Sequence, residues 1–177
     1  MSDQPHISAS ILNADFSRLG EEVERADGGG VDSIHLDVMD GHFVDNLTMG
    51  PVVIEAMRPH SVLPFHSHLM ISRPLAYAAR FAQAGSDLIV FHVEADDDPR
   101  AVIAEIERAG RRPGIALNPE TPAAGIDRFV RILRDGGVTV TVRDTRGREI
   151  EAACGQLHAQ LAGKSLREAR AALAARP

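Results

Sequence analysis

The 177-residue sequence has few of the residues that build covalent or aromatic sites. It contains no tryptophan, one tyrosine, one cysteine (Cys154) and one lysine (Lys164). A single cysteine excludes an intramolecular disulfide and any metal site made only of cysteines. A Schiff-base enzyme of the barrel type needs a buried lysine on a strand, and the only lysine lies near the C-terminus. We therefore expect an aliphatic core, with the chemistry carried by other side chains.

Long apolar runs are also missing. No segment approaches the length of a membrane-spanning helix, so we expect no membrane partner. The first residues lack the basic and apolar regions of a signal peptide. These two observations predict a cytoplasmic protein.

Charge is distributed unevenly along the chain. Residues 1–122 carry 9 basic and 19 acidic side chains, a net charge of −10, whereas residues 123–177 carry 10 and 6, a net charge of +4. Seven of the eight histidines lie in the acidic part. We interpret residues 1–122 and 123–177 as two regions of different origin. A basic end can indicate nucleic-acid contact, but a solvated helical surface explains so small an excess, and no nucleic-acid partner is expected.

The segment from Ile34 to Phe43 is the most informative part of the sequence. Ile34, Leu36 and Val38 alternate with His35, Asp37 and Met39, and this period of two predicts a strand. His35 and Asp37 then project from one face, about 7 Å apart along the strand. His66 and His68 repeat the pattern in a second segment. Imidazole and carboxylate groups from neighbouring strands would suit a divalent metal.

Strand-like and helix-like segments alternate along the chain, which predicts an α/β protein with a mostly parallel sheet. The strands are expected at 7–12, 33–38, 64–70, 88–92, 112–117 and 138–142, and the helices at 15–26, 52–58, 74–84, 98–109, 126–133 and from 149 onward. About six strand–helix units are too few for a closed barrel of eight, which needs about 250 residues. The fold class predicted is thus an incomplete (β/α) TIM-type barrel. Its exposed sheet edges would favour a homo-oligomer.

Residues 6–122 resemble the ribulose-phosphate 3-epimerase family in six blocks, which follow the order of the family. The blocks are Ile7–Leu12, Ile34–Val44, Asn46–Pro51, His68–Ile71, His92–Ala95 and Gly114–Pro122. The resemblance implies interconversion of D-ribulose 5-phosphate and D-xylulose 5-phosphate, with a sugar phosphate as the small-molecule partner.

The resemblance also implies roles for individual residues. His35, Asp37 and His68 match metal ligands of the family, and the metal would be Zn, Fe, Mn or Co. Asp37 matches a catalytic acid/base. Substrate-contacting positions correspond to His35 and His68 and to three further residues, Ser10, Met39 and Met70. The alternatives are a buried hydrogen-bonded cluster for the ligands, a turn hydroxyl for Ser10 and plain core for the methionines.

After Pro122 this resemblance stops. The family has a later aspartate that is both a metal ligand and the second acid/base, and this aspartate has no match here. Glu94 and Asp135 are the two candidates to replace it. We therefore expect impaired activity, or alternatively a catalytically inactive remnant that binds metal or sugar phosphate.

Residues 126–160 resemble the C-terminal end of the radical-SAM RNA adenine C2-methyltransferases, through Ala-Cys-Gly-Gln-Leu at 153–157. That family also needs three cysteines for an iron–sulfur cluster, and one cysteine in total excludes radical chemistry. Cys154 is expected to be a buried small apolar residue. Arg143, Arg146 and Arg148 could be a relic of RNA contact, although a solvated face is the simpler interpretation.

Overall fold

The computed structural model describes residues 6–118, 121, 127, 130 and 131. The chain divides into two compact units, one of residues 1–116 with 161–177 and the other of residues 117–160. Nearly all of the described residues belong to the first unit, whose described part runs from 6 to 116. In the second unit, Asp127, Val130 and Arg131 are helical, and the backbone N–H of Thr121 donates to the carbonyl of Asn118 at 2.9 Å.

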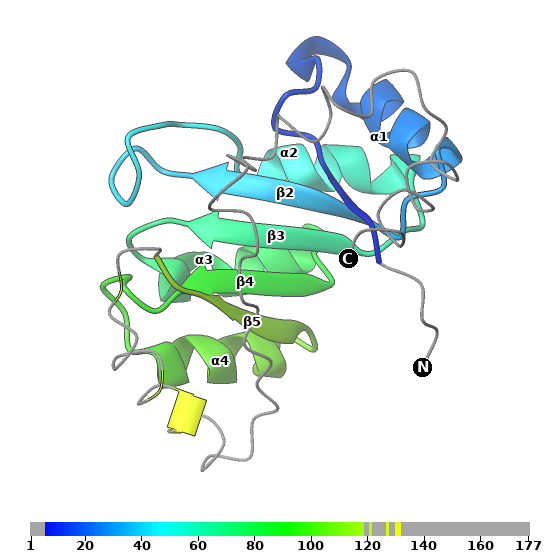
Figure 1. Ribbon diagram of the computed structural model, residues 1–177. Helices are drawn as coiled ribbons and strands as arrows, with labels where there is room; N and C mark the ends of the chain where they lie inside the picture. Colours follow the sequence, from blue (N-terminus) through cyan, green and yellow to red (C-terminus); the bar gives the residue numbers. More distant parts are fainter. Residues whose placement is uncertain (1–5, 119–120, 122–126, 128–129, 132–177) are drawn as a thin grey trace, which may run out of the picture. The chain divides into compact units, whose positions relative to one another are not determined.

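A five-stranded parallel sheet organises residues 6–116 (Figure 1). The strands are β1 (Ser8–Ser10), β2 (Ser33–Met39), β3 (Phe65–Met70), β4 (Leu88–His92) and β5 (Arg112–Ala116). They lie in the order in which they occur in the chain, and every neighbouring pair is parallel. Between them come α1 (Leu19–Gly28), α2 (Pro51–Met57), α3 (Pro74–Gln83) and α4 (Pro99–Arg108). Sequential parallel strands joined by helices are the arrangement of part of a TIM-type barrel.

The helices begin and end where local chemistry favours it. Asp98 accepts a hydrogen bond from the N–H of Arg100 at 3.2 Å and caps α4, and Pro99 takes the first position, where no N–H is needed. Gly30 and Gly110 follow α1 and α4 with φ of 79° and 73°, a left-handed conformation that few other residues adopt without strain. Asp15 also caps, but its helix starts as the 3₁₀ turn η1 (Phe16–Arg18).

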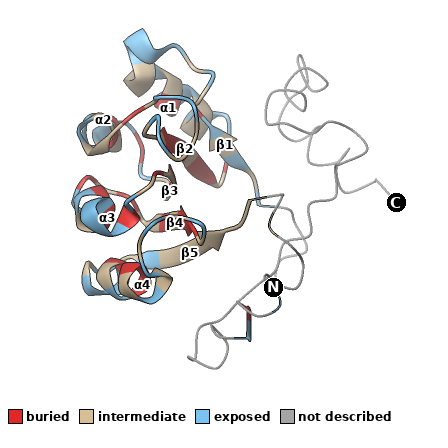
Figure 2. Ribbon diagram, turned by 90° about the vertical axis from the view of Figure 1, so that its left-hand side faces the viewer, coloured by how far each residue is buried: buried red, intermediate tan, exposed pale blue. Residues whose placement is uncertain are grey.

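One face of the sheet packs on the helices and forms the core (Figure 2). Along the strands this face carries Ile34, Leu36, Phe65, Leu69, Ile89 and Phe91, all at most 1 % exposed. The helices contribute Val23, Ile54, Phe81, Val102 and Ile106, which are equally buried. Because strand side chains alternate, the intervening residues point to the opposite face. That second face carries His35, Asp37, Met39, His66, His68, Met70 and His92.

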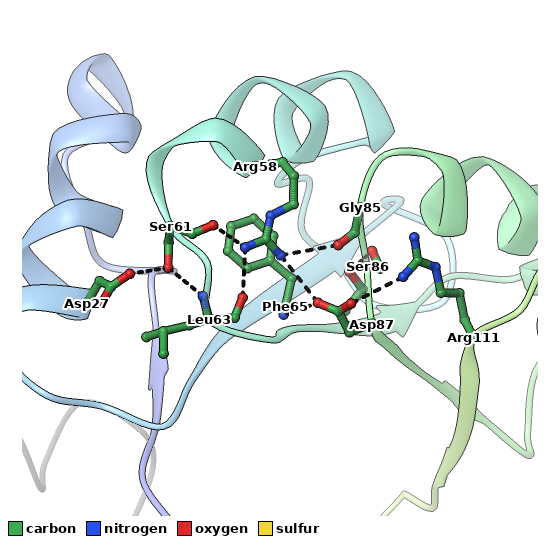
Figure 3. A network of polar contacts seen from close by, with 10 residues as sticks. Asp27, Arg58, Ser61, Leu63, Phe65, Gly85, Ser86, Asp87 and Arg111 are labelled. Carbon is green, nitrogen blue, oxygen red and sulfur yellow. Dashed lines mark hydrogen bonds and ion pairs between the residues drawn. The ribbon is translucent and has the colours of Figure 1, made fainter.

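Arg58, in the 3₁₀ helix η2 (Arg58–His60), joins the amino ends of β3 and β4 (Figure 3). Its guanidinium donates to the carbonyl oxygens of Ser61 and Leu63, the latter at 2.8 Å, and lies 3.8 Å above the ring of Phe65. It also reaches the Asp87 carboxylate at 3.3 Å. The chain turns here at Gly85, whose φ is 106° and where a Cβ would lie 2.6 Å from Arg58 Cδ. The network fixes the end of the sheet opposite the histidine-rich strand ends.

The predicted fold class is confirmed, and the five strands and four helices expected between residues 7 and 117 are all present. Their bounds differ from the prediction by a few residues at most. The sixth strand, the helix from 149 onward, Cys154 and the arginines at 143, 146 and 148 lie outside the described residues. Within the described part of the chain, no helix combines the length and the apolar character needed to cross a bilayer.

Candidate metal centre

Asp37 lies at the centre of a polar cluster on the face of the sheet opposite the helices. The residue is 8 % exposed, and its carboxylate accepts hydrogen bonds from Ser10 Oγ at 2.8 Å and from His35 Nε2 at 3.1 Å. The register of β2 and β3 places His68 directly beside it, and His68 Nδ1 lies 3.4 Å from Asp37 Oδ1. Three adjacent strands therefore supply the groups around one carboxylate.

The triad of His35, Asp37 and His68 has the geometry of a metal site. One nitrogen or oxygen from each residue lies within 4.8 Å of the other two. Two ligands that bind one ion at about 2.1 Å in a tetrahedral arrangement lie about 3.4 Å apart. The separations of 3.1 and 3.4 Å between the ring nitrogens and Asp37 Oδ1 are close to this value. Two imidazoles and a carboxylate are also a common donor set for Zn²⁺, Fe²⁺, Mn²⁺ and Co²⁺.

The electrostatics of the site keep Asp37 ionised. Burial acts to raise its pKa, but hydrogen bonds from His35 and His68, the charge of His35 and the Ser10 hydroxyl outweigh it and hold the pKa far below the ordinary value. An ionised carboxylate at neutral pH can bind a cation or accept a proton. Asp37 is therefore in the chemical state that either role requires.

Met39 and Met70 are paired in the strand register, two residues beyond Asp37 and His68. Both are half-buried and lie at the carboxyl ends of their strands, on the same face as the triad. Active sites in barrel proteins lie at this end of the sheet. The two thioethers thus lie on the same face as the triad, at the carboxyl ends of β2 and β3.

The loop after β2 is held by Asp40 and Thr48. Asp40 accepts hydrogen bonds from the N–H groups of His42 and Phe43, both at 2.9 Å, and from the N–H of Ser72 after β3 at 2.8 Å. Thr48 Oγ1 donates to the Asp37 carbonyl at 2.6 Å. Burial raises the pKa of Asp40, but the three backbone donors outweigh this and lower it. The loop is therefore tied to both strands that carry the triad.

His92 at the end of β4 is part of the cluster, although the sequence analysis did not assign it. Its Nε2 lies 2.9 Å from Nε2 of His68, and the two rings are stacked with their centroids 5.0 Å apart. Burial, followed by the neighbouring His68, lowers the pKa of His92 and so favours the neutral ring. A signal existed: Leu88, Val90 and His92 follow the same period of two, so His92 shares the face of the triad.

The other candidate residues lie outside the triad. Glu94 lies next to Nδ1 of His92, at 3.4 Å, rather than beside Asp37. His66 stacks on His6 at 6.2 Å, and burial and the nearby Arg112 lower its pKa. His42 is exposed and donates from Nδ1 to the Asp40 carbonyl at 2.9 Å. Asp135 is not among the described residues, so the described triad has one carboxylate.

The sequence of the chain matches that of a known protein family. Residues 6–145 match the sequence model of the ribulose-phosphate 3 epimerase family. The match extends past Pro122, where the resemblance ended in the sequence analysis.

Three curated relatives show the same similarity. The ribulose-phosphate 3-epimerase of Bacillus subtilis is 46 % identical over 68 % of this chain and 56 % of its own length. The enzyme of the same name from Synechocystis is 46 % identical over 69 % and 54 %, and that from Rhodobacter capsulatus is 44 % identical over 71 % and 55 %. The chain thus spans about half the length of the curated relatives that it matches.

Proposed function

Because the chain belongs to the ribulose-phosphate 3-epimerase family, we propose that it acts in the metal-assisted epimerisation of D-ribulose 5-phosphate and D-xylulose 5-phosphate. The observation that carries this proposal is the convergence of His35, Asp37 and His68 from two adjacent strands. The reaction inverts C3 of the sugar, next to the C2 ketone. It requires a base to remove the C3 proton and a positive charge near the C2 oxygen.

The triad meets the second requirement through its ligand set. A divalent ion bound there would act as a Lewis acid at the C2 oxygen and stabilise the negative charge that develops as the proton leaves. His35 and His68 provide the neutral nitrogen donors. Zn, Fe, Mn and Co all suit these donors, and we propose one of these four as the metal.

Asp37 meets the first requirement. It is ionised, and its second oxygen is oriented by the Ser10 hydroxyl at 2.8 Å. We assign Asp37 as the base that takes the C3 proton, with Ser10 as the residue that fixes the carboxylate. Met39 and Met70 exclude water from the open side, which strengthens the charge interactions at C2.

Epimerisation also needs an acid on the opposite side of C3, to return the proton to the other face. The described triad has one carboxylate, and this single observation favours a second candidate function. In this alternative, the protein binds metal and sugar phosphate without turnover. The two functions share their ligands and differ only in catalysis.

Metal content and turnover, measured on the same samples, test the proposal. We expect His35→Ala and His68→Ala each to lower the bound metal, measured by elemental analysis after reconstitution with Zn²⁺, Fe²⁺, Mn²⁺ or Co²⁺. Asp37→Asn should abolish turnover in a coupled epimerase assay, because the amide cannot accept the proton. His60→Ala is the control, since His60 pairs with Glu24 at the helical surface. Unchanged metal content in the two histidine variants would refute the ligand assignment, and binding without turnover in the wild type would favour the second function.

We also propose that the protein forms a homo-oligomer. Within residues 6–116, β1 and β5 each pair with a single strand. Strands with one unpaired side favour association with another chain. Light scattering after size-exclusion chromatography measures the mass directly, and a monomer at micromolar concentration would contradict the proposal.

A further inference from the structure

We propose that His92 and Glu94 are positioning residues for His68: they set its tautomer so that the lone pair of Nδ1 faces the triad. This inference rests on the proposed metal centre and deepens it. Neither residue belongs to the triad. Both act through a chain of polar contacts that runs from Glu94 to His92 and then to His68.

The first link is the contact of 2.9 Å between Nε2 of His68 and Nε2 of His92. A neutral imidazole has one N–H and one lone pair, so one ring must donate and the other accept. If His68 donates, its Nδ1 carries the lone pair and faces Asp37. If His92 donates, Nδ1 of His68 carries the proton instead. Only the first arrangement allows His68 to bind a metal, because a ligand nitrogen must be deprotonated.

The second link favours the first arrangement. When Nε2 of His92 accepts, its proton lies on Nδ1, which points toward Glu94 Oε2 at 3.4 Å. When Nε2 donates, the Nδ1 lone pair faces the carboxylate, and the two repel each other. Glu94 therefore stabilises the tautomer of His92 that accepts, which is the tautomer that His68 needs once its Nδ1 binds a metal instead of hydrogen-bonding Asp37. Metal-binding histidines in general donate their second N–H to a neighbouring group that fixes the ring in this way.

The surroundings of His92 leave few other hydrogen-bond partners for its Nδ1 among the described residues. The residue is 7 % exposed, and its Nδ1 is enclosed and forms no aligned hydrogen bond within the part of the chain that the structure describes. Phe43 covers the ring, with centroids 4.9 Å apart. Water therefore has little access to Nδ1, and Glu94 is the charged group that lies next to it.

Zinc affinity of variants tests the chain of contacts. We expect His92→Leu, which cannot accept from His68, to bind Zn²⁺ about 10–100-fold more weakly in competition with a chromophoric chelator. Glu94→Ala should weaken binding about tenfold. His92→Gln should stay within about threefold of wild type, because an amide oxygen can still accept from His68. A purely structural role for His92 would not predict this rescue.

Controls and a spectroscopic readout complete the test. His60→Leu and Glu24→Ala remove a carboxylate–imidazole pair of 2.7 Å at the helical surface, and their zinc affinity should equal that of wild type. Far-UV circular dichroism establishes that each variant is folded. In the zinc-loaded wild type, ¹⁵N chemical shifts should show His92 protonated at Nδ1.

The possible outcomes are distinct. Zinc binding by wild type with equal affinity in His92→Leu and Glu94→Ala would overturn this inference and leave the metal centre intact. Protonation of His92 at Nε2 in the loaded protein would overturn it as well. A wild-type protein that binds no zinc would overturn the proposed metal centre together with the inference.

Discussion

Replacing Arg58 by alanine should destabilise the fold strongly without changing the metal centre. Arg58 closes the network at the amino ends of β3 and β4, whereas the triad lies toward the carboxyl ends of β2 and β3. In barrel folds the amino ends of the strands contribute to stability, and the carboxyl ends carry the active site. The variant therefore tests whether the two ends of this sheet are functionally separate.

The size of the effect follows from the contacts. Arg58 donates to the carbonyls of Ser61 and Leu63, pairs with the half-exposed Asp87 and stacks on Phe65. Two charged hydrogen bonds contribute about 1.5 kcal/mol each, and the ion pair and the stacking each contribute up to about 1 kcal/mol. The free energy of unfolding should fall by about 3–5 kcal/mol, a large part of the about 5–15 kcal/mol typical of a domain.

Urea unfolding followed by far-UV circular dichroism measures this loss, since the chain has no tryptophan for fluorescence. Arg58→Lys should recover less than half of it, because an ammonium cannot reach both carbonyls in the fixed geometry of a guanidinium. Arg108→Ala is the matched control: Arg108 bonds Glu105 at 2.6 Å on the exposed side of α4, and we expect little measurable change. A stable Arg58→Ala protein, or a folded one with altered zinc affinity, would refute the reasoning.

Two further predictions concern the polar groups around the triad. Ser10→Ala should lower kcat about tenfold, because Asp37 loses the donor that orients it, whereas zinc affinity should change less. A coupled epimerase assay measures kcat, and a zinc titration measures the affinity. An unchanged kcat would contradict the role of Ser10. Asp40→Asn should cost about 1–2 kcal/mol of stability near neutral pH, because the NH₂ group that takes the place of Oδ2 cannot accept from the Ser72 N–H. The pKa of Asp40 is lowered in the folded state. The ionised carboxylate therefore contributes to folding stability above the ordinary pKa of 3.8, and this contribution is lost as the pH falls through the lowered pKa. Urea unfolding between pH 3 and 7 should thus show a shallower acid loss in the variant, and parallel curves would contradict this assignment.

The sequence predicted the strands and helices because local patterns determine them. A period of two marked β2 and β3, and glycines marked the ends of α1 and α4. The same alternation placed His35 and Asp37 on one face of β2. The family resemblance then pointed to His68 and Ser10 as their neighbours in the site.

Other features depend on contacts between distant segments, which no local pattern contains. The pairing of Asp37 with His68 follows from the register of β2 and β3. The bond between His68 and His92 requires the next strand to stand in register as well. Arg58 is an unremarkable residue in the sequence, and only the fold brings it over Phe65 and next to Asp87. Asp15 capped a helix as predicted, but its bond to the Ser17 N–H gives a 3₁₀ turn first.

The alternation along β2 makes this protein sensitive to changes in chain length. Inserting or deleting one residue between Ser33 and His35 would turn every following side chain of the strand to the other face. His35 and Asp37 would enter the apolar layer under the helices, and Leu36 and Val38 would face the open side. Single substitutions at these positions remove one ligand, whereas a shift of one residue exchanges the core and the site.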